Sequence, residues 1–253
     1  MDPSLLVLPG VLSASALATA WARRHQGRKL AHLLEARSTS VAELLDLQRT
    51  VAEQMGACSF AERVKLYGEI VCEDPLIAPW SSEPCVAFSQ SSTAQMEVRE
   101  ESTQTDSAGN RRTEVRWSRR DETLDSLERR CRFDLRQGSR SLPIQPDHAE
   151  LELETVFTQV DPPTRSDTAT TRHLGVRREE AILKASGMAF VVAESSDASG
   201  TLQLQAPTSG GLFVVRRGNE DTFSRAIRRW RRIWMVCTWV LAAAAVLVLL
   251  TSL

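Results

Sequence analysis

The amino-acid sequence predicts a mainly β fold, closed or sandwiched, that is anchored in a membrane by a transmembrane helix at each end. Long apolar segments without charged residues lie near both ends of the 253-residue chain. Between them, many short runs alternate apolar with polar residues, and turn-forming residues separate the runs. The 31 Lys and Arg residues nearly balance the 32 Asp and Glu residues, which argues against a nucleic-acid partner.

The first apolar segment, residues 4–22, reads "SLLVLPGVLSASALATAWA" and predicts the first transmembrane helix. A cleaved signal peptide is the alternative, because small residues occur at Ala14, Ala16 and Ala18. The preceding "MDPS" contains no Lys or Arg, however, and the basic residues "RRHQGRK" follow the apolar run. We therefore favour a retained anchor.

Residues 23–56 are expected to form a helical collar. Within "STSVAELLDLQRTVAEQMG", Ser40 and Glu43 have the spacing of a capping box, and Gly56 marks the end of the helix. The polar face of this helix carries charges of both signs, which favours packing against the next domain over a position on a membrane surface.

Residues 63–217 are expected to form a β-rich domain. "DSAGN" and "SSDASG" each lie between two strand-like runs, so each predicts a hairpin turn. Many short strands at even spacing favour a closed or sandwiched arrangement over a doubly wound sheet.

The chain is expected to end in a basic amphipathic helix over residues 219–232 and a second transmembrane helix over 233–253. The second segment is uncharged and long enough to cross a hydrocarbon core of about 30 Å. Indole and guanidinium groups favour the level of the lipid headgroups. They predict a membrane interface made of Trp230, Trp234, Arg228, Arg229, Arg231 and Arg232. The predicted location is an integral, multi-pass membrane protein, in an organelle outer membrane of a eukaryote or an inner membrane of a bacterium.

No catalytic residue, cofactor or metal ligand is predicted. The four histidines, His25, His32, His148 and His173, are scattered, and we interpret them as surface or capping residues. Cys58 and Cys85 lack the sequence signature of a catalytic nucleophile. In "HAELELETVF" the acidic residues alternate, which is typical of the solvated face of a strand.

Several motifs occur in a fixed order: "KLYGEIVCEDPLIAPWSSEPCVAF", "RTEVRW", "LETVF", "LGVRREEAILKASGMAFVVAES" and "GTLQLQAPTSGGLFVV". In this order, and in the helical and apolar segment that follows, the chain resembles the GIDE family, which includes mulan and the plant organelle-envelope ubiquitin ligases. The resemblance implies a β-rich domain, called BESIDE, between two transmembrane helices, with a RING finger after the second. The five cysteines contain no C-x₂-C pair, so no RING zinc site is expected within these 253 residues.

The resemblance implies a membrane-tethered binding or sensing module, similar to the substrate-recognition part of a GIDE-type E3 ubiquitin ligase. One alternative is a component of a membrane E3 ligase, acting in ubiquitination and organelle organisation, whose RING lies in a partner or is missing from the gene model. Another is a bacterial membrane protein of stress or defence signalling. Whether the chain is an enzyme stays open. The expected partners are the lipid bilayer, a protein partner or substrate, and a RING-bearing or E2 protein.

Overall fold

The computed structural model describes residues 18, 21–22, 24–25, 27–105, 111–218, 225, 229–230 and 232–240. The chain divides into two compact units. The first contains Met1–Ile70, Asp134–Glu150 and Met188–Leu253, and the second contains Val71–Phe133 and Leu151–Gly187. Each unit has a β-sheet of its own.

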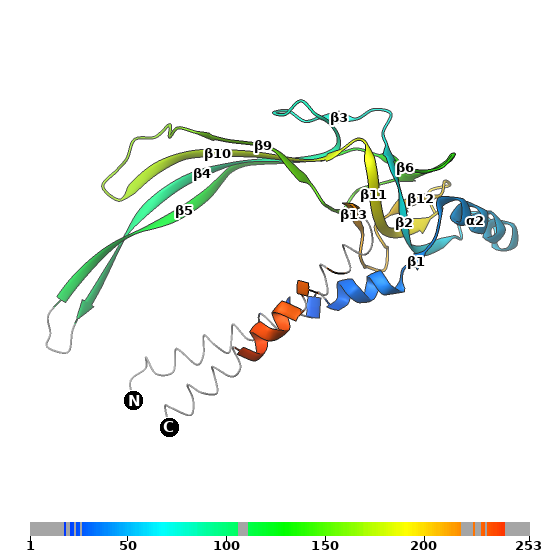
Figure 1. Cartoon of the computed structure of the whole chain (residues 1–253), viewed down its shortest axis with the longest axis horizontal. Helices are drawn as coiled ribbons and strands as arrows, with labels where there is room; N and C mark the ends of the chain where they lie inside the picture. The colour runs from blue at the N-terminus through cyan, green and yellow to red at the C-terminus, as the bar shows by residue number, and fades with distance from the viewer. Residues whose placement is uncertain are drawn as a thin grey trace, which may run out of the picture. The chain divides into compact units, whose positions relative to one another are not determined.

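The sheet of the first unit contains a closed barrel (Figure 1). Its eight strands are hydrogen-bonded in the order β1-β2-β6-β7-β12-β11-β13-β8, and a further pairing of β2 with β11 closes five of them into a ring. β12 runs parallel to β7 and antiparallel to β11. This strand order is that of a five-stranded Greek-key barrel of the OB type. The bounds are β1 Arg37–Ser38, β2 Ala61–Val71, β6 Phe133–Gln137, β7 Arg140–Ile144, β8 Glu150–Leu151, β11 Gly187–Ser196, β12 Gln203–Gln205 and β13 Val214–Arg217.

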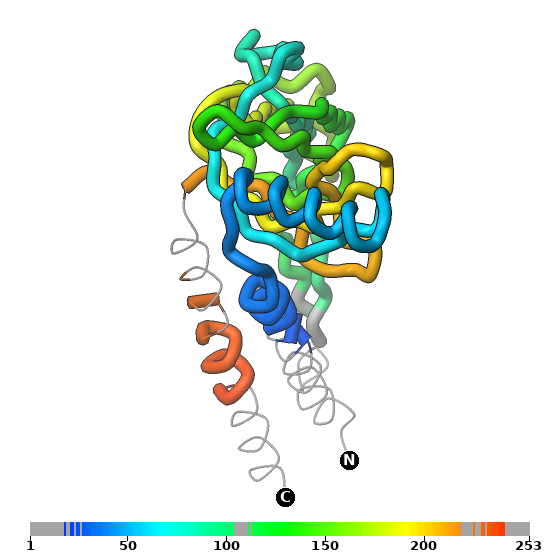
Figure 2. Tube along the Cα trace, turned by 90° about the vertical axis from the view of Figure 1, so that its right-hand side faces the viewer, coloured from blue at the N-terminus to red at the C-terminus, as the bar shows by residue number. Residues whose placement is uncertain are grey.

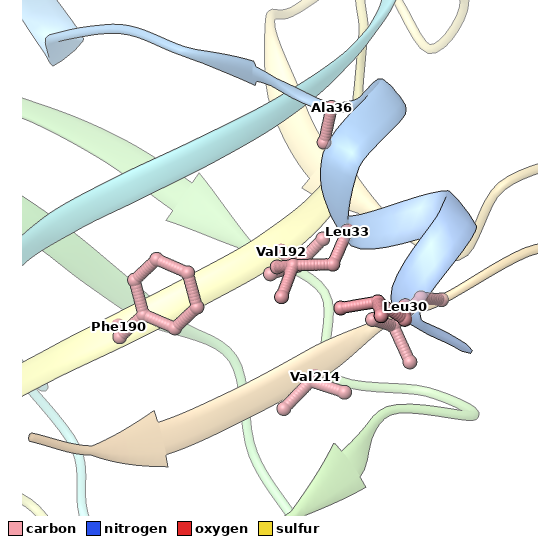
Figure 3. Packing of buried hydrophobic residues seen from close by; sticks show 7 residues of the cluster. Leu30, Leu33, Ala36, Phe190, Val192 and Val214 are labelled. Carbon is pink, nitrogen blue, oxygen red and sulfur yellow. The ribbon is translucent and has the colours of Figure 1, made fainter. Parts of the chain in front are cut away.

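Strand β11 is buried on both faces, which explains its nearly continuous apolar sequence "MAFVVA". Phe190 and Val192 on one face pack against Leu30 and Leu33 of a helix over residues 27–35 (Figure 3). Because side chains alternate along a strand, Val191 points to the opposite face, and it is also buried. Each fully buried leucine or phenylalanine of this core contributes about 1.5–3 kcal/mol of transfer free energy.

Helix α2, Val41–Met55, begins and ends as its sequence predicts. The Glu43 N–H donates to the Ser40 hydroxyl at 3.1 Å, and Gly56 ends the helix with φ 92°. The helix contacts β7 (Figure 2). At its N-terminus the Val41 N–H donates to Oε1 of Gln137 at 2.9 Å. The interpretation of this helix as a packing element is therefore confirmed.

The second unit is an extended antiparallel sheet. Its longest strands, β4 and β5, form a hairpin whose outermost described pair is Thr105 with Arg111. This pairing confirms the predicted hairpin, whose tip, 106–110, lies outside the described residues. β10 pairs with the other side of β4, and β9 pairs with β10. The bounds are β3 Leu76–Ile77, β4 Pro84–Thr105, β5 Arg111–Arg130, β9 Glu154–Asp161 and β10 Thr171–Lys184.

The apolar core of the second unit is confined to one end of its sheet. Ala78, Cys85, Phe88 and Ile182 form this core. Beyond Phe88, β4 continues for 17 residues as "SQSSTAQMEVREESTQT", in which Ser, Thr and charged residues predominate. At about 3.3 Å per residue, the 22-residue strand extends about 70 Å. Most of this sheet therefore contacts solvent on both faces.

The predicted membrane-anchored fold and the multi-pass membrane location are corrected by the structure. None of the described helices is both long and apolar enough to cross a membrane. The longest, α2, has 15 residues, which is about 22 Å at 1.5 Å per residue and short of a hydrocarbon core of about 30 Å. Most of the predicted spans, 4–22 and 233–253, and most of the predicted helix 219–232 lie outside the described residues.

Candidate functional site

Strand β9 forms an open edge of the second unit's sheet. Among the described strands it pairs only with β10, so every second backbone N–H and C=O of β9 points away from the sheet. Its central residues, "TVFTQV" from Thr155 to Val160, carry no charge and are rich in residues that favour strands. Val160 is 59% exposed. This edge has the properties of a template for an additional strand.

Strand β5 forms another edge of the same sheet and differs strongly from β9. Seven arginines and five acidic residues make twelve of its 20 residues charged. Charged side chains along an edge are a common protection against pairing with another chain. Within the described sheet, β9 is therefore the edge better suited to strand addition.

A loop over residues 78–83 lies beside β9 and is fixed by one buried carboxylate. Glu180 of β10 has no exposed surface. Its two oxygens accept from the N–H groups of Trp80 and Ser81, each at 2.9 Å, and from the Ser81 hydroxyl at 2.6 Å. A buried carboxylate is stable when hydrogen-bond donors surround it in this way. Glu180 thus anchors the loop on β10.

The anchored loop places an aromatic pair at the strand edge. The rings of Trp80 and of Phe157 on β9 lie 5.7 Å apart between centroids and are tilted by 49°. Trp80 and Phe157 are both half-buried, and Ile77 nearby in the sequence is 59% exposed. An incoming strand would therefore meet an apolar surface on one face of β9 and the side chains of Thr158 and Val160 on the other.

The charges at the two ends of β9 are paired within the second unit. Nε of Arg178 lies 3.1 Å from Oδ2 of Asp161 in an ion pair. At the other end, the ammonium group of Lys184 lies 3.3 Å from Glu83 and 4.0 Å from Glu154. The middle of the edge is thus neutral.

The residues predicted to form a membrane interface lie near the end of the described chain. Arg229, Trp230 and Arg232 are exposed, with Trp230 at 52%, and Trp234 is half-buried in the helical stretch 232–240. Arg228 and Arg231 lie outside the residues whose side chains are described. No observation tests their interface role, which stays a prediction.

Three of the four histidines, which look scattered in the sequence, come together in the first unit. His25, His32 and His148 line one cavity of about 410 Å³, whereas His173 lies on β10 in the second unit. In the part of the chain that is described, no three His, Cys, Asp or Glu side chains are grouped so that they could hold a metal ion.

Two cysteines of the second unit lie close together. The sulfur atoms of Cys72 and Cys131 are 3.8 Å apart. Burial raises the pKa of the Cys131 thiol to about 11, and a hydrogen bond with Cys72 adds to the rise. Burial, assisted by the charge of Glu180, likewise raises the pKa of Cys85 to about 11. Such thiols are protonated at neutral pH and are poor nucleophiles.

Glu180 and the cavity that the histidines line were not predicted from the sequence. In "VRREEAILK" Glu180 lies two residues before the apolar Ile182 on the same face of the strand, where burial is expected, and this is its only signal. The histidines carry no signal, because His25 and His148 are separated by more than 120 residues.

The sequence of this chain matches the model of one known protein family. The GIDE model, described as E3 ubiquitin ligase, matches residues 101–250, which is more than half of the chain. Comparison with curated proteins and with solved structures gave no significant match. The match confirms the resemblance noted in the sequence, and it indicates a protein partner or substrate in general terms.

Proposed function

We propose that this chain, which belongs to the GIDE family, is a protein-recognition module of an E3 ubiquitin ligase and binds an extended segment of its partner at the outer edge of β9. The observation that carries the proposal is the contrast between the two edges of one sheet. The centre of β9 is uncharged and exposed, whereas β5 is charged along most of its length.

Strand addition fits the chemistry of the β9 edge. Backbone hydrogen bonds to the free N–H and C=O groups supply affinity that does not depend on the partner's sequence. Specificity comes from alternate side chains, which meet Phe157 and Trp80 on one face and Thr158 and Val160 on the other. The expected occupant is an uncharged, β-forming peptide of about six residues, the length of the uncharged run.

Peptide selection followed by edge substitutions tests this recognition. Peptides are selected from a random library on the full chain, and their affinities are measured for Thr158→Lys and Val160→Lys. Lysine on an edge strand opposes pairing, and both side chains are exposed, so folding is retained. We expect a loss of affinity of about tenfold or more for each variant, a change of about 1.4 kcal/mol.

The control places the same change on the other edge. Thr123→Lys on β5 introduces the same charge at an exposed position, and we expect it to leave the affinity unchanged. If the selected peptides bind the β9 variants as tightly as the wild-type chain, β9 is not the recognition surface.

The ligase role is tested separately from peptide binding. A carrier protein that bears a selected peptide is incubated with the full chain in a eukaryotic cell extract that supplies E1, E2 and RING proteins. We expect ubiquitin conjugation to the carrier to rise with the wild-type chain and not with Val160→Lys. Tight binding without any rise in conjugation would support peptide recognition by this chain but contradict its role in ubiquitin transfer.

A further inference from the structure

The cavity in the first unit is lined mainly by groups that bind anions. Arg28, Lys29 and His32 come from the N-terminal helical region, His148 precedes β8 and Glu150 begins it, and a glycine turn at 210–211 completes the wall. Its volume of about 410 Å³ lies in the range of small-molecule sites. Glu150 is the single acidic residue in the lining.

The one acidic residue of the cavity is already neutralised. The ammonium group of Lys29 donates to Oε2 of Glu150 at 2.5 Å. Arg28, by contrast, has no hydrogen bond or ion pair within the described structure, and its side chain is exposed. The lining therefore retains one uncompensated positive charge, and a guanidinium group is well suited to bind two oxygens of a phosphate.

A second arginine fixes the orientation of His32. Nη1 of Arg63 lies 3.3 Å from Nδ1 of His32, and its guanidinium also donates to the Gly210 carbonyl at 2.9 Å. Because an arginine only donates, Nδ1 of His32 accepts and Nε2 carries the hydrogen. The carboxylate of Glu35 lies 3.5 Å from the same Nδ1, which is too far to compete as an acceptor of a strong hydrogen bond. Nε2 of His32 is thus a donor that a ligand can use.

The wall also contains apolar and strained residues. Leu212 and Phe213 are almost fully buried and supply an apolar side of the cavity. His148 has φ 63°, a left-handed conformation that is uncommon for residues other than glycine. Backbone strain of this kind is concentrated at functional sites.

We propose that this cavity binds a small organic phosphate, with the phosphoryl group held by Arg28, Lys29 and the histidines and the organic part against Leu212 and Phe213. This site lies in the first unit and goes beyond protein recognition at β9. Its chemistry differs from a metal site, because Arg28 and Lys29 repel cations.

Titration with defined anions tests the proposal. Binding of phenyl phosphate, inorganic phosphate and acetate to the full chain is followed by ³¹P or ¹H NMR at matched ionic strength. We expect phenyl phosphate to bind most tightly, because it contacts both the basic groups and the apolar wall, inorganic phosphate to bind more weakly, and acetate to bind least.

Matched variants distinguish a built site from general charge attraction. Arg28→Gln removes the unpaired guanidinium, and we expect the affinity for phenyl phosphate to fall at least about tenfold, as for the loss of a charge-assisted hydrogen bond. Arg49→Gln removes an exposed arginine of α2 that does not line the cavity, and we expect no change. Equal affinity of all three proteins, equal binding of acetate, or no phosphate binding by the wild-type chain would each overturn the proposal.

Discussion

At the scale of single residues, buried hydrogen-bonding groups determine which loops are held in place. Glu180 is the clearest case, because its carboxylate alone accepts from three donors of the 78–83 loop. Removing an acceptor leaves its donors buried and unpaired, and each unpaired donor costs about 1–3 kcal/mol.

We expect Glu180→Ala to lower the free energy of unfolding by about 3 kcal/mol or more, because several donors lose their acceptor together. The measurement is urea unfolding, with Glu179→Gln as the neighbouring control. Glu179 is half-buried and makes an ion pair with Arg177 at the surface, so its change is expected to be within about 0.5 kcal/mol. Equal losses for both variants would contradict the anchoring role of Glu180.

Asp197 plays a similar part in the first unit. Its oxygens accept from Nε2 of Gln48 at 3.0 Å and from the Phe60 N–H at 2.9 Å. The hydrogen bond from Gln48 and that from Phe60 lower the pKa of Asp197 below its usual value of 3.8. Because the folded pKa is lowered, its stabilising contribution is present above the usual pKa and is lost as the pH falls through the lowered value.

We therefore expect the free energy of unfolding of Asp197→Asn to fall less with decreasing pH than that of the wild-type chain. At neutral pH the variant loses about 1–3 kcal/mol, and the difference from the wild-type chain shrinks as the pH falls below about 4. Chemical unfolding at neutral and acidic pH measures this, with the exposed Asp74→Asn as the control. A difference that stays constant with pH would show that the Asp197 charge is not the source of the effect.

The raised thiol pKa values predict a loss of stability at alkaline pH, opposite to the acid effect of Asp197. The pKa values of Cys85 and Cys131 rise from 9.0 to about 11 in the folded chain. The unfolded chain therefore loses thiol protons first as the pH rises above about 9, and the stabilising contribution of the neutral thiols is lost between about 9 and 11. Cys58, in contrast, is exposed.

We expect iodoacetamide to modify Cys58 well before Cys85 and Cys131 at about pH 8, because only the thiolate reacts and burial opposes its formation. Peptide mass spectrometry after short reaction times measures the order. Unfolded chain serves as the control and is expected to react at all the cysteines. Modification of Cys131 in the folded chain as fast as that of Cys58 would contradict the raised pKa.

At the scale of elements, close backbone contacts fix how β9 meets β10. Gly175 lies at a register shift of β10, has φ 142°, and leaves no room for a Cβ atom beside the backbone oxygen of Asp161. Only glycine allows this approach without displacement of the strand. The end of the proposed binding edge therefore depends on Gly175.

We expect Gly175→Ala to loosen the pairing of β9 with β10 and to cost about 1–3 kcal/mol beyond the strain of the backbone angle. Gly138→Ala is the matched control, because Gly138 also has a positive φ of 62° but has open space around its Cβ position. Amide hydrogen exchange of residues 158–161 is expected to accelerate only in Gly175→Ala. Equal exchange in both variants would contradict the steric role of Gly175.

Local signals in the sequence are sufficient for elements whose partners are near in the chain. The Ser40 cap, the Gly56 stop and the hairpin around 106–110 follow from residues within one or two turns, and the structure contains the corresponding helix and strand pair. The predicted membrane helices were wrong for the described residues, because apolar length and basic flanks indicate a span only where a long apolar helix forms, and none of the described helices is long and apolar enough to cross a membrane.

At the scale of the whole molecule, the sequence predicted a closed or sandwiched β structure but not how it is built. The barrel closes through the pairing of β2 with β11, whose residues are more than 110 positions apart. Hydrophobic alternation specifies which face of a strand is buried and not which strand is its neighbour. For the same reason, two long-range contacts could not be predicted from the sequence. They are the contact of Glu180 with the 78–83 loop and the grouping of His25, His32 and His148 in one cavity.

The division into two units also explains how a family fold can carry two independent sites. The barrel unit holds the basic cavity, and the extended sheet holds the β9 edge. Substitutions at β9 are therefore expected to leave phosphate binding unchanged, and Arg28→Gln is expected to leave peptide binding unchanged, because sites in separate units without shared partners behave additively.

In the proposed function, β9 pairs with an extended segment of a partner protein. Amide hydrogen exchange of the full chain, with and without a library-selected peptide, tests it most directly, because strand addition protects the outward-pointing N–H groups of β9. We expect slower exchange within residues 155–160 on binding and no change along β5. Protection elsewhere, with β9 exchanging as in the free chain, would contradict it.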